Sequence, residues 1–339
     1  MSAGTLTVLE PEGLYPDTRL DQEVLGPGVR ILQGNAKTGL ADLPDALLAE
    51  VDGLMTLRMP VPAEQIARFP RLKVVIRMGV GYDRVDRAAC AARGIKVCNV
   101  PDYGTQEVAE FAVLLALSLR RGLILYHDTQ RGPDPARWGV MPSPLHRRQE
   151  AQTFGILGLG RIGSAAALRA KAFGYRVAFF DPFIPNGWDR ALGIARTRTL
   201  EELLAQSDVL SIHAPLTRGT RGLIGERELR LLPPNAVVVN TARGPILDID
   251  ALERCLRDGH LAGAGLDVLP EEPPRDPVPA LLRAYRAGEA WLRGRLVITP
   301  HIAFHTPEAW DDIRLKSLET MRDVLVEGKA TNVIPPGSD

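Results

Sequence analysis

The sequence predicts an α/β protein with two doubly wound parallel sheets, and three observations support this fold class. Short apolar runs alternate with segments of helical periodicity before residue 100 and again after residue 150, as in repeated βα units. The second series opens on a glycine-rich turn, which is typical of a nucleotide-binding sheet. The chain has 339 residues, which is long for one hydrophobic core, so we expect two domains.

The first series contains five apolar runs that we interpret as strands: TLTVL, VRILQ, GLMTL, LKVVI and IKVCNV. Three segments between them have apolar residues at helical spacing: PDALLAEV, PAEQIARF and DRVDRAACAARG. The loop RMGVGYD, residues 77–83, follows a buried strand with two glycines. Ligands of open α/β sheets bind beyond the carboxyl ends of strands, so this loop could offer backbone N–H groups to a small anion. A plain strand-to-helix turn explains the spacing equally well.

The middle of the chain departs from this alternation. Residues 104–122 predict one long helix, and residues 127–150, rich in Pro, Arg and Gly, predict an exposed irregular excursion that could be a dimer arm. The second series then predicts the helices EELLAQ, ERELRLL and DIDALERCLRDG and the strands DVLSIH, NAVVVN, LAGAGLDV and LVITP. A last helix, from Pro307 to about Gly328, follows the completed sheet, and such a helix commonly returns to the first domain.

The glycine-rich turn lies within residues 153–181, which predict strand, turn, helix and a second strand ending on an acid. Gly158 permits the sharp turn, Gly160 lets a pyrophosphate approach the backbone, and Gly163 lets helix and strand pack closely. The helix opening near Arg161 directs its free N–H groups toward that pyrophosphate. Asp181 follows Gly163 by 18 residues, where its carboxylate can accept hydrogen bonds from an adenosine ribose. Together these features predict a dinucleotide site.

Composition excludes several classes of function. Lys+Arg and Asp+Glu both total 41, so no net charge attracts nucleic acid or an anionic membrane. The three cysteines, Cys90, Cys98 and Cys255, suit a reducing cytoplasm and have no metal-ligand spacing, so we expect no metal. The N-terminus lacks the pattern of a signal peptide, and the most apolar segment, residues 111–119, is too short to span a bilayer.

Three polar residues follow strands of the second series, where ligands are expected. Arg243 follows VVVNTA, Glu272 follows LDVLPE and His301 follows VITP. Arginine suits bidentate binding of a carboxylate, and histidine can transfer a hydroxyl proton near neutral pH. A carboxylate on the far ring nitrogen would orient the imidazole and favour its charged form. Each residue alone could be an ordinary loop residue, but together beside a dinucleotide fold they predict an active site.

The other histidines carry less signal. His213 ends a strand and could contact adenosine or be structural, and His305 could compete with His301 as the acid–base. His127, His146 and His260 suggest no role. We find no Walker lysine, nucleophile elbow or basic–aromatic pattern.

At these residues the sequence resembles the D-isomer-specific 2-hydroxyacid dehydrogenases, most closely the branch that contains the C-terminal binding proteins. The matching stretches, from about residue 70 to 330, are RMGVGYD, NVP, GILGLGRIGSAAALRAKAFG, FFDP, VVVNTARGPILD, GAGLDVLPEEPP and TPHIAFHT. The resemblance implies a flavodoxin-like substrate domain (residues 1–102 and 308–339), a Rossmann NAD-binding domain (103–307), an active site in the cleft between them and a homodimer formed through the coenzyme domains.

The resemblance also assigns roles to residues. It implies that Arg243 binds the keto acid, Glu272 pairs with the histidine, and His301 is the acid–base. The implied cofactor-binding residues are Gly158, Leu159, Gly160, Arg161, Ile162, Gly163, Asp181, His213, Ala214, Pro215, Thr220, Thr241, Ala242, Arg243, Asp267 and His301, with Asp267 at the nicotinamide carboxamide. The implied substrate-binding residues are Arg77, Met78, Gly79, Val80, Gly81, Arg243 and Phe304.

Two departures limit the resemblance. Phe304 stands where that branch has tryptophan, so the branch's substrate preference does not carry over, and residues 275–295 form a longer segment than in many members. We therefore expect a cytoplasmic, NAD-dependent oxidoreductase of small 2-keto and D-2-hydroxy acids, without nucleic-acid or membrane partners. The alternatives are a 3-phosphoglycerate dehydrogenase and an NAD(H)-responsive binding module similar to the C-terminal binding proteins.

Overall fold

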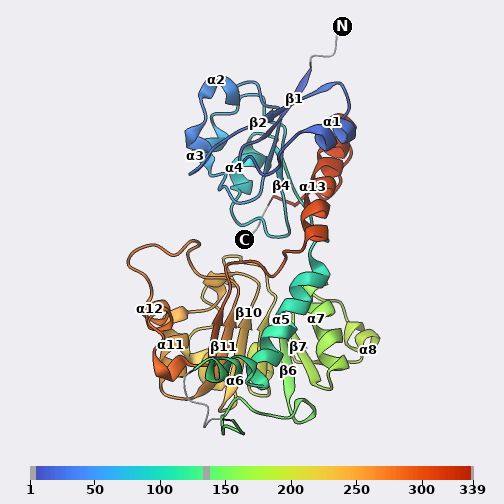
Figure 1. The fold of residues 1–339 in the computed structure, drawn as a ribbon. Helices are drawn as coiled ribbons and strands as arrows, with labels where there is room; N and C mark the ends of the chain where they lie inside the picture. Colours follow the sequence, from blue (N-terminus) through green and yellow to red (C-terminus); the bar gives the residue numbers. More distant parts are fainter. Residues whose placement is uncertain (1–4, 133–137, 337–339) are drawn as a thin grey trace. The chain divides into compact units, whose positions relative to one another are not determined.

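The computed structural model describes residues 5–132 and 138–336. The chain forms two compact units, one of Met1–Gly104 with His305–Asp339 and the other of Thr105–Phe304 (Figure 1). In the described part of the chain each unit contains one parallel sheet, of five and of seven strands. The predicted fold class of two parallel-sheet α/β domains is confirmed.

The five-stranded sheet has the order β2-β1-β3-β4-β5, which is the flavodoxin-like order of doubly wound sheets. Its strands coincide with the five predicted apolar runs: β1 (Leu6–Glu10), β2 (Val29–Gln33), β3 (Gly53–Thr56), β4 (Val74–Arg77) and β5 (Lys96–Asn99). Its helical segments are α1 (Arg19–Leu25), η1 (Leu40–Asp42), α2 (Asp45–Leu48), α3 (Ala63–Ile66) and α4 (Arg87–Ala92). Helix α1 was not predicted, because one of its two buried residues is the charged Asp21.

The C-terminal helix α13 (Pro307–Met321) belongs to this same unit and continues into a π-helical turn, η6 (Arg322–Val326). Figure 1 shows α13 beside α1, and it also packs against β4. A Cβ on Gly53 would lie 2.7 Å from Met321 Sδ, so the end of α13 rests directly on β3. The sheet and the helix therefore form one core although they are distant in sequence.

The seven-stranded sheet has the order β12-β11-β10-β9-β6-β7-β8, so the strand order reverses between β9 and β6, as in a Rossmann sheet. Its strands are β6 (Thr153–Leu157), β7 (Arg176–Phe180), β8 (Ala195–Arg196), β9 (Val209–Ile212), β10 (Ala236–Asn240), β11 (Leu261–Leu266) and β12 (Leu296–Ile298). The short strand β8 was not predicted, since two residues give no periodic pattern. The predicted glycine turn follows β6, directly at the point of reversal.

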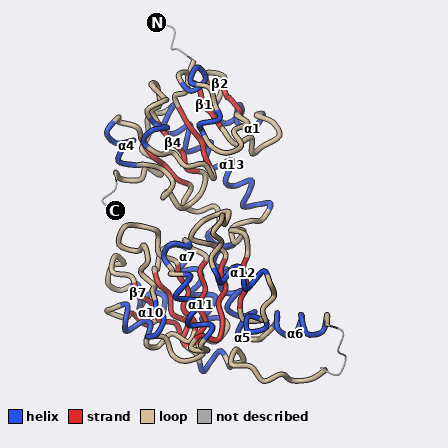
Figure 2. The backbone as a smooth tube through the Cα atoms, turned by 90° about the vertical axis from the view of Figure 1, so that its left-hand side faces the viewer, coloured by secondary structure: helices blue, strands red, loops and turns tan. Residues whose placement is uncertain are grey.

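Helices cover both faces of this sheet, and Figure 2 shows the strands inside them. Val238 packs in the cluster that contains Leu229 and Leu252, whereas its neighbours Val237 and Val239 pack in the cluster with Ala112 and Ala166. The helical segments are α5 (Thr105–Arg120), α6 (Leu123–Gln130), η3 (Gln149–Ala151), α7 (Arg161–Ala172), α8 (Trp188–Leu192), α9 (Leu200–Leu204), α10 (Glu226–Leu231), η4 (Gly244–Ile246), α11 (Ile249–Arg257), α12 (Ala280–Arg286) and η5 (Ala290–Leu292).

One prediction in this region was wrong. Residues 127–130 were expected to begin an irregular excursion, but they form the last turn of α6. The Thr129 hydroxyl donates to the Leu125 carbonyl at 2.8 Å, so this polar side chain is hydrogen-bonded within the helix. The segment is therefore helical although it has no apolar periodicity. The rest of the expected excursion includes residues 133–137, which lie outside the described residues. No helix within 5–132 or 138–336 has the length and apolarity needed to cross a membrane.

Arg314 joins α13 to the N-terminal segment of its unit. Its guanidinium lies 4.4 Å from the centre of the Tyr15 ring and donates to the Asp17 carbonyl and the Asp21 carboxylate. The side chains of Arg314 and Asp21 are only 12% and 5% exposed. Removing one partner of a buried ion pair leaves the other charge without compensation.

We therefore predict that Arg314→Met lowers the free energy of unfolding by about 3–5 kcal/mol. Lys316→Met is the matched control on the same helix: it removes the Lys316 ion pairs with Asp102 and Asp312, whose carboxylates are 57% and 46% exposed, and should change stability by less than about 1 kcal/mol. Urea unfolding of both variants measures the difference. Equal effects would show that the Arg314 cluster adds no special stability.

Candidate active site

The glycine turn between β6 and α7 leaves open space at one glycine and none at the other two. Gly158 has a left-handed φ of 93°, and a Cβ there would lie 2.8 Å from the Ala214 nitrogen. A Cβ on Gly163 would lie 2.1 Å from the Gly158 oxygen, so helix and turn are in direct contact. A Cβ on Gly160, in contrast, would meet no atom within 4 Å. The open side of the turn therefore lies at Gly160, beside the N-terminus of the 12-residue helix α7.

Asp181 lies at the end of β7 and faces the same turn. Its Oδ2 accepts from the Leu159 N–H and its Oδ1 from the Phe183 N–H, both at 2.9 Å. Two backbone donors thus fix the carboxylate beside the glycines. Each carboxylate oxygen can accept more than one hydrogen bond, so capacity remains for the hydroxyls of a ribose.

Two further polar groups follow neighbouring strands. His213, after β9, has Nε2 at 2.8 Å from the Ser211 hydroxyl, and burial lowers the pKa of His213 to about 4. Its ring is therefore neutral in the range where an acid–base residue must titrate. The Thr241 hydroxyl, after β10, is buried and has no hydrogen-bond partner among the described residues. A dinucleotide cofactor fits this arrangement. It would find the buried Thr241 hydroxyl, the space at Gly160 and the carboxylate of Asp181.

Other residues that were expected to bind the cofactor make contacts within the protein itself. Ala214 packs against Gly158, and the Thr220 hydroxyl donates to the Pro215 carbonyl at 2.6 Å, which closes the turn after β9. Arg161 and Ile162 begin α7, so their N–H groups belong to its first turn.

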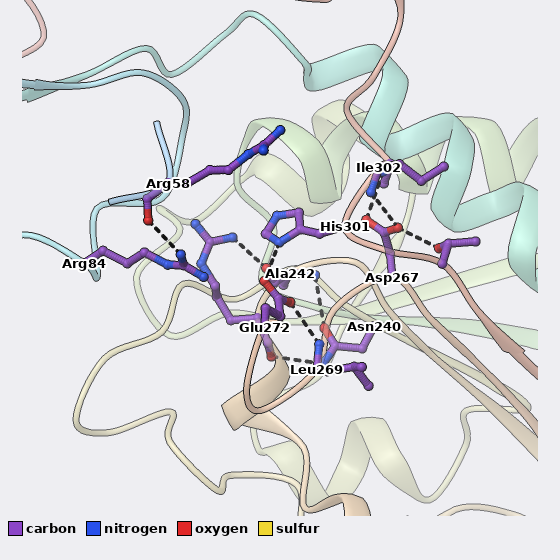
Figure 3. A network of polar contacts seen from close by, with 12 residues as sticks. Arg58, Arg84, Asn240, Ala242, Asp267, Leu269, Glu272, His301 and Ile302 are labelled. Atoms are coloured by element: carbon purple, nitrogen blue, oxygen red, sulfur yellow. Dashed lines mark hydrogen bonds and ion pairs between the residues drawn. The ribbon is translucent and has the colours of Figure 1, made fainter. Parts of the chain in front are cut away.

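His301 and Glu272 form a hydrogen-bonded pair, shown in Figure 3. His301 Nδ1 lies 2.7 Å from Glu272 Oε2, and the other carboxylate oxygen accepts from the Leu269 N–H at 2.9 Å. An ionised carboxylate only accepts, so Nδ1 carries the hydrogen and Nε2 remains for proton exchange. The neighbouring Glu271 instead lies 3.6 Å from Arg275, so it does not replace Glu272.

The loop that carries His301 is held by Asp267, at the end of β11. Asp267 Oδ1 accepts from the Thr299 hydroxyl at 2.6 Å and the Ile302 N–H at 2.9 Å, and Oδ2 accepts from the Ala303 N–H at 2.9 Å. His301 itself has a left-handed φ of 56° and donates its N–H to the Asp267 carbonyl. Burial raises the pKa of Asp267, while the hydrogen bonds act in the opposite direction. Its expected contact with a nicotinamide carboxamide stays a prediction beside this observed role.

Arg243 lies on a turn that is held by the side chain of Asn240, a role that was not predicted from the sequence. The Asn240 side chain accepts from the Ala242 N–H at 3.0 Å, and both residues are labelled in Figure 3. It also donates to the Arg243 carbonyl at 3.0 Å. The guanidinium donates to the Ala242 carbonyl at 2.7 Å. Asn240 is 1% exposed, and the only sequence signal for its role is an amide at the end of an apolar strand. The ring of Phe304 lies edge-on to His301, with centroids 6.4 Å apart.

In the unit that contains the N-terminus, two carbonyls of the loop after β4 accept hydrogen bonds from the end of β5 and the residue after it. Gly79 O accepts from the Val100 N–H at 3.0 Å and Val80 O from the Asn99 side chain at 2.7 Å. Within the described residues, the N–H groups of Val80 and Gly81 have no acceptor. A Cβ on Gly79 would lie 1.7 Å from Arg77 Nη1, so the guanidinium folds across this glycine. Met78 is fully buried, so its side chain is part of the core.

Comparison with known proteins identifies the family. The model of the D-isomer specific 2-hydroxyacid dehydrogenase NAD-binding domain matches residues 113–303, more than half of the chain. The chain belongs to the D-isomer specific 2-hydroxyacid dehydrogenase family. The predicted family is confirmed, and membership in this dehydrogenase family implies oxidoreduction between 2-keto and 2-hydroxy acids with a nicotinamide cofactor. The branch of the C-terminal binding proteins stays a prediction.

Curated relatives and solved structures cover nearly the whole dehydrogenase. A glyoxylate reductase of Thermococcus gammatolerans is 38% identical, over 87% of this chain and 90% of the relative, and one of Korarchaeum cryptofilum is 35% identical, over 84% and 82%. A D-lactate dehydrogenase of Aquifex aeolicus, complexed with NAD and lactic acid, superposes with a TM-score of 0.82 at 27% identity, over 98% of this chain and 100% of that chain.

A second solved structure carries the other nicotinamide cofactor. An NADPH-dependent glyoxylate/hydroxypyruvate reductase of Sinorhizobium meliloti, in complex with NADP and malonate, superposes with a TM-score of 0.83 at 30% identity, over 98% of this chain and 97% of that chain. Structures similar to this chain thus carry either NAD or NADP.

We predict that Asp267→Asn loosens the loop that carries His301. An amide can accept at one side only, so its NH₂ group would face the N–H of Ala303 or Ile302. Losing a hydrogen bond to a charged acceptor, about 1.5–3 kcal/mol, should speed hydrogen exchange at that amide roughly 10- to 100-fold. Asp248→Asn, at a surface position that also accepts two backbone N–H bonds, is the control and should leave this loop protected. Unchanged exchange in Asp267→Asn would contradict the interpretation.

Proposed function

We propose that this protein is an NAD-dependent reductase that interconverts small 2-keto acids and D-2-hydroxy acids. The observation that carries the proposal is the 2.7 Å hydrogen bond between His301 and Glu272, at the carboxyl ends of the sheet that also bears the glycine turn. Such a pair leaves one imidazole nitrogen to exchange a proton with a substrate oxygen. Arg243 supplies a guanidinium on the neighbouring turn, suited to a carboxylate.

In the proposed reaction the residues of this chain handle the proton and the charges. The chemistry that bound NADH supplies is a hydride for C2 of the keto acid. His301 Nε2 gives a proton to the carbonyl oxygen as it becomes an alkoxide, and the product is the 2-hydroxy acid. Glu272 stabilises the charged ring and keeps its orientation. Arg243 pairs with the substrate carboxylate. The N–H groups of Val80 and Gly81, in the other unit, are suited to a small anion.

Asp181 supports NAD as the preferred cofactor. Its carboxylate is fixed by Leu159 and Phe183 where a ribose hydroxyl is expected, so a 2′-phosphate would meet a negative charge there. Residue 182 is a proline, so no adjacent cation compensates.

We further propose that the Thr105–Phe304 unit is the coenzyme domain and that the other unit binds substrate. The expected boundaries, 102/103 and 307/308, differ from those of the compact units by two and three residues. Leu114 on α5 and Leu168 on α7 are 52% and 47% exposed, and these helices pack together, so we propose this face as the homodimer interface.

The proposal predicts NADH oxidation with at least one small 2-keto acid in a panel of pyruvate, glyoxylate, hydroxypyruvate, phenylpyruvate and phosphohydroxypyruvate. Catalytic efficiency should be at least ~10-fold higher with NADH than with NADPH, because of the charge of Asp181. Arg243→Ala is the control variant: it should bind NADH but lose about 100-fold in turnover. NADH binding without turnover of any keto acid would indicate a binding module instead, and turnover of phosphohydroxypyruvate alone would indicate a 3-phosphoglycerate dehydrogenase.

A second prediction concerns Glu272. A glutamine at this position keeps much of the shape of the carboxylate but carries no charge to stabilise a protonated ring, and it holds the orientation of His301 less firmly. Glu272→Gln should therefore lower turnover by about 100-fold in both directions. Steady-state kcat for keto-acid reduction and for hydroxy-acid oxidation measures this.

His213→Gln is the control for that experiment. Because burial lowers the pKa of His213 to about 4, this ring stays neutral between pH 5 and 8 and cannot serve as the acid, so its replacement should lower turnover far less. Full turnover in Glu272→Gln together with a large loss in His213→Gln would transfer the acid–base role away from His301.

A further inference from the structure

Gly244 follows Arg243 and is buried at the start of the turn η4. Its backbone is not left-handed, unlike that of Gly158, so its conformation does not require glycine. The reason for a glycine at this position must therefore be space.

The space is occupied by another backbone segment. A Cβ on Gly244 would lie 1.9 Å from the Leu269 carbonyl carbon, 2.0 Å from its oxygen and 2.4 Å from the Pro270 nitrogen. The peptide bond between Leu269 and Pro270 thus rests on the Cα of Gly244. A backbone peptide cannot rotate aside as the end of a flexible side chain can, so any side chain here must displace the segment.

The displaced segment is the one that orients Glu272. The Leu269 N–H donates to Glu272 Oε1 at 2.9 Å, and Glu272 Oε2 bonds to His301 Nδ1 at 2.7 Å. On the other side of the contact, Asn240 holds the turn that carries Arg243. Gly244 is therefore the point where the turn of Arg243 and the turn of Glu272 touch.

We propose that Gly244 is a positioning residue, whose missing side chain sets the place of the Glu272–His301 pair relative to Arg243. The catalytic consequence rests on the proposed function, but the structural consequence does not. A methyl group at Gly244 shifts the Leu269–Pro270 peptide, which moves the N–H that holds Glu272. The carboxylate then no longer meets Nδ1 at the observed distance, and the ring loses its fixed orientation.

The first test needs no turnover. In proton NMR, the Nδ1–H of His301 donating to Glu272 should give a downfield resonance, assigned by its loss in Glu272→Gln. In Gly244→Ala this resonance should shift upfield or broaden away. Gly263→Ala is the matched control, since its Cβ would also strike a backbone oxygen, that of Arg295 at 2.6 Å, but in strand β11 away from the pair. It should keep the resonance.

The second test uses keto-acid reduction. Gly244→Ala should lower kcat by about 100-fold, as expected for misplaced catalytic groups, with little change in the KM for NADH. Because Gly244 acts through Glu272, the double variant Gly244→Ala/Glu272→Gln should be no slower than Glu272→Gln alone.

A retained resonance in Gly244→Ala, or losses that multiply in the double variant, would overturn the proposal. If no keto acid is turned over at all, the proposed function fails while the resonance still tests Gly244. If Gly244→Ala does not fold, Asn240→Ser loosens the same turn from the other side by removing the bond to the Arg243 carbonyl. An unchanged resonance in Asn240→Ser would equally overturn the inference.

Discussion

The hydrogen bond between His301 and Glu272 joins two loops that leave neighbouring strands, β12 and β11. Neither loop has a sheet ladder to hold it, so its backbone groups need other partners. Side-chain carboxylates provide them: Glu272 accepts from Leu269, and Asp267 accepts from Ile302 and Ala303. The pair is therefore in place because the loops around it are fixed by two carboxylates, the buried Asp267 and the partly buried Glu272.

The same solution recurs at the glycine turn. Asp181 accepts one N–H from the turn after β6 and one from its own loop after β7, so a single carboxylate aligns two loops. Asn240, at the end of β10, holds its own following turn with an amide. Parallel strands end at a common edge, and polar residues at their last positions can each reach the next loop. The edge that binds ligands is thus also the edge where loop structure is determined by side chains.

Patterns within short stretches made much of this predictable. The strands other than β8 and most of the longer helices follow from apolar periodicity. The glycine turn, Arg243, Glu272 and His301 follow from residue types beyond strand ends. Helix α1 could not be predicted in that way, because one of its two buried residues is Asp21, whose charge is compensated by Arg314 from nearly 300 residues away. The contact of Gly244 with the Leu269–Pro270 peptide likewise depends on two loops meeting in space, which no local pattern records.

The discontinuous unit has a consequence for synthesis on the ribosome. β1 to β5 leave the ribosome early, but the helix that rests on Gly53 comes from the other end of the chain. The edge of β5 is also completed late, because Asn99 donates its N–H to the Asn332 carbonyl and Ile334 donates to Val97. Until residues 307–334 emerge, the nascent five-stranded sheet therefore shows an apolar face and an open strand edge, both of which attract other chains. The intervening unit is continuous from Thr105 to Phe304, so its folding does not depend on the C-terminal segment. The second sheet in the sequence is therefore the first that can be completed.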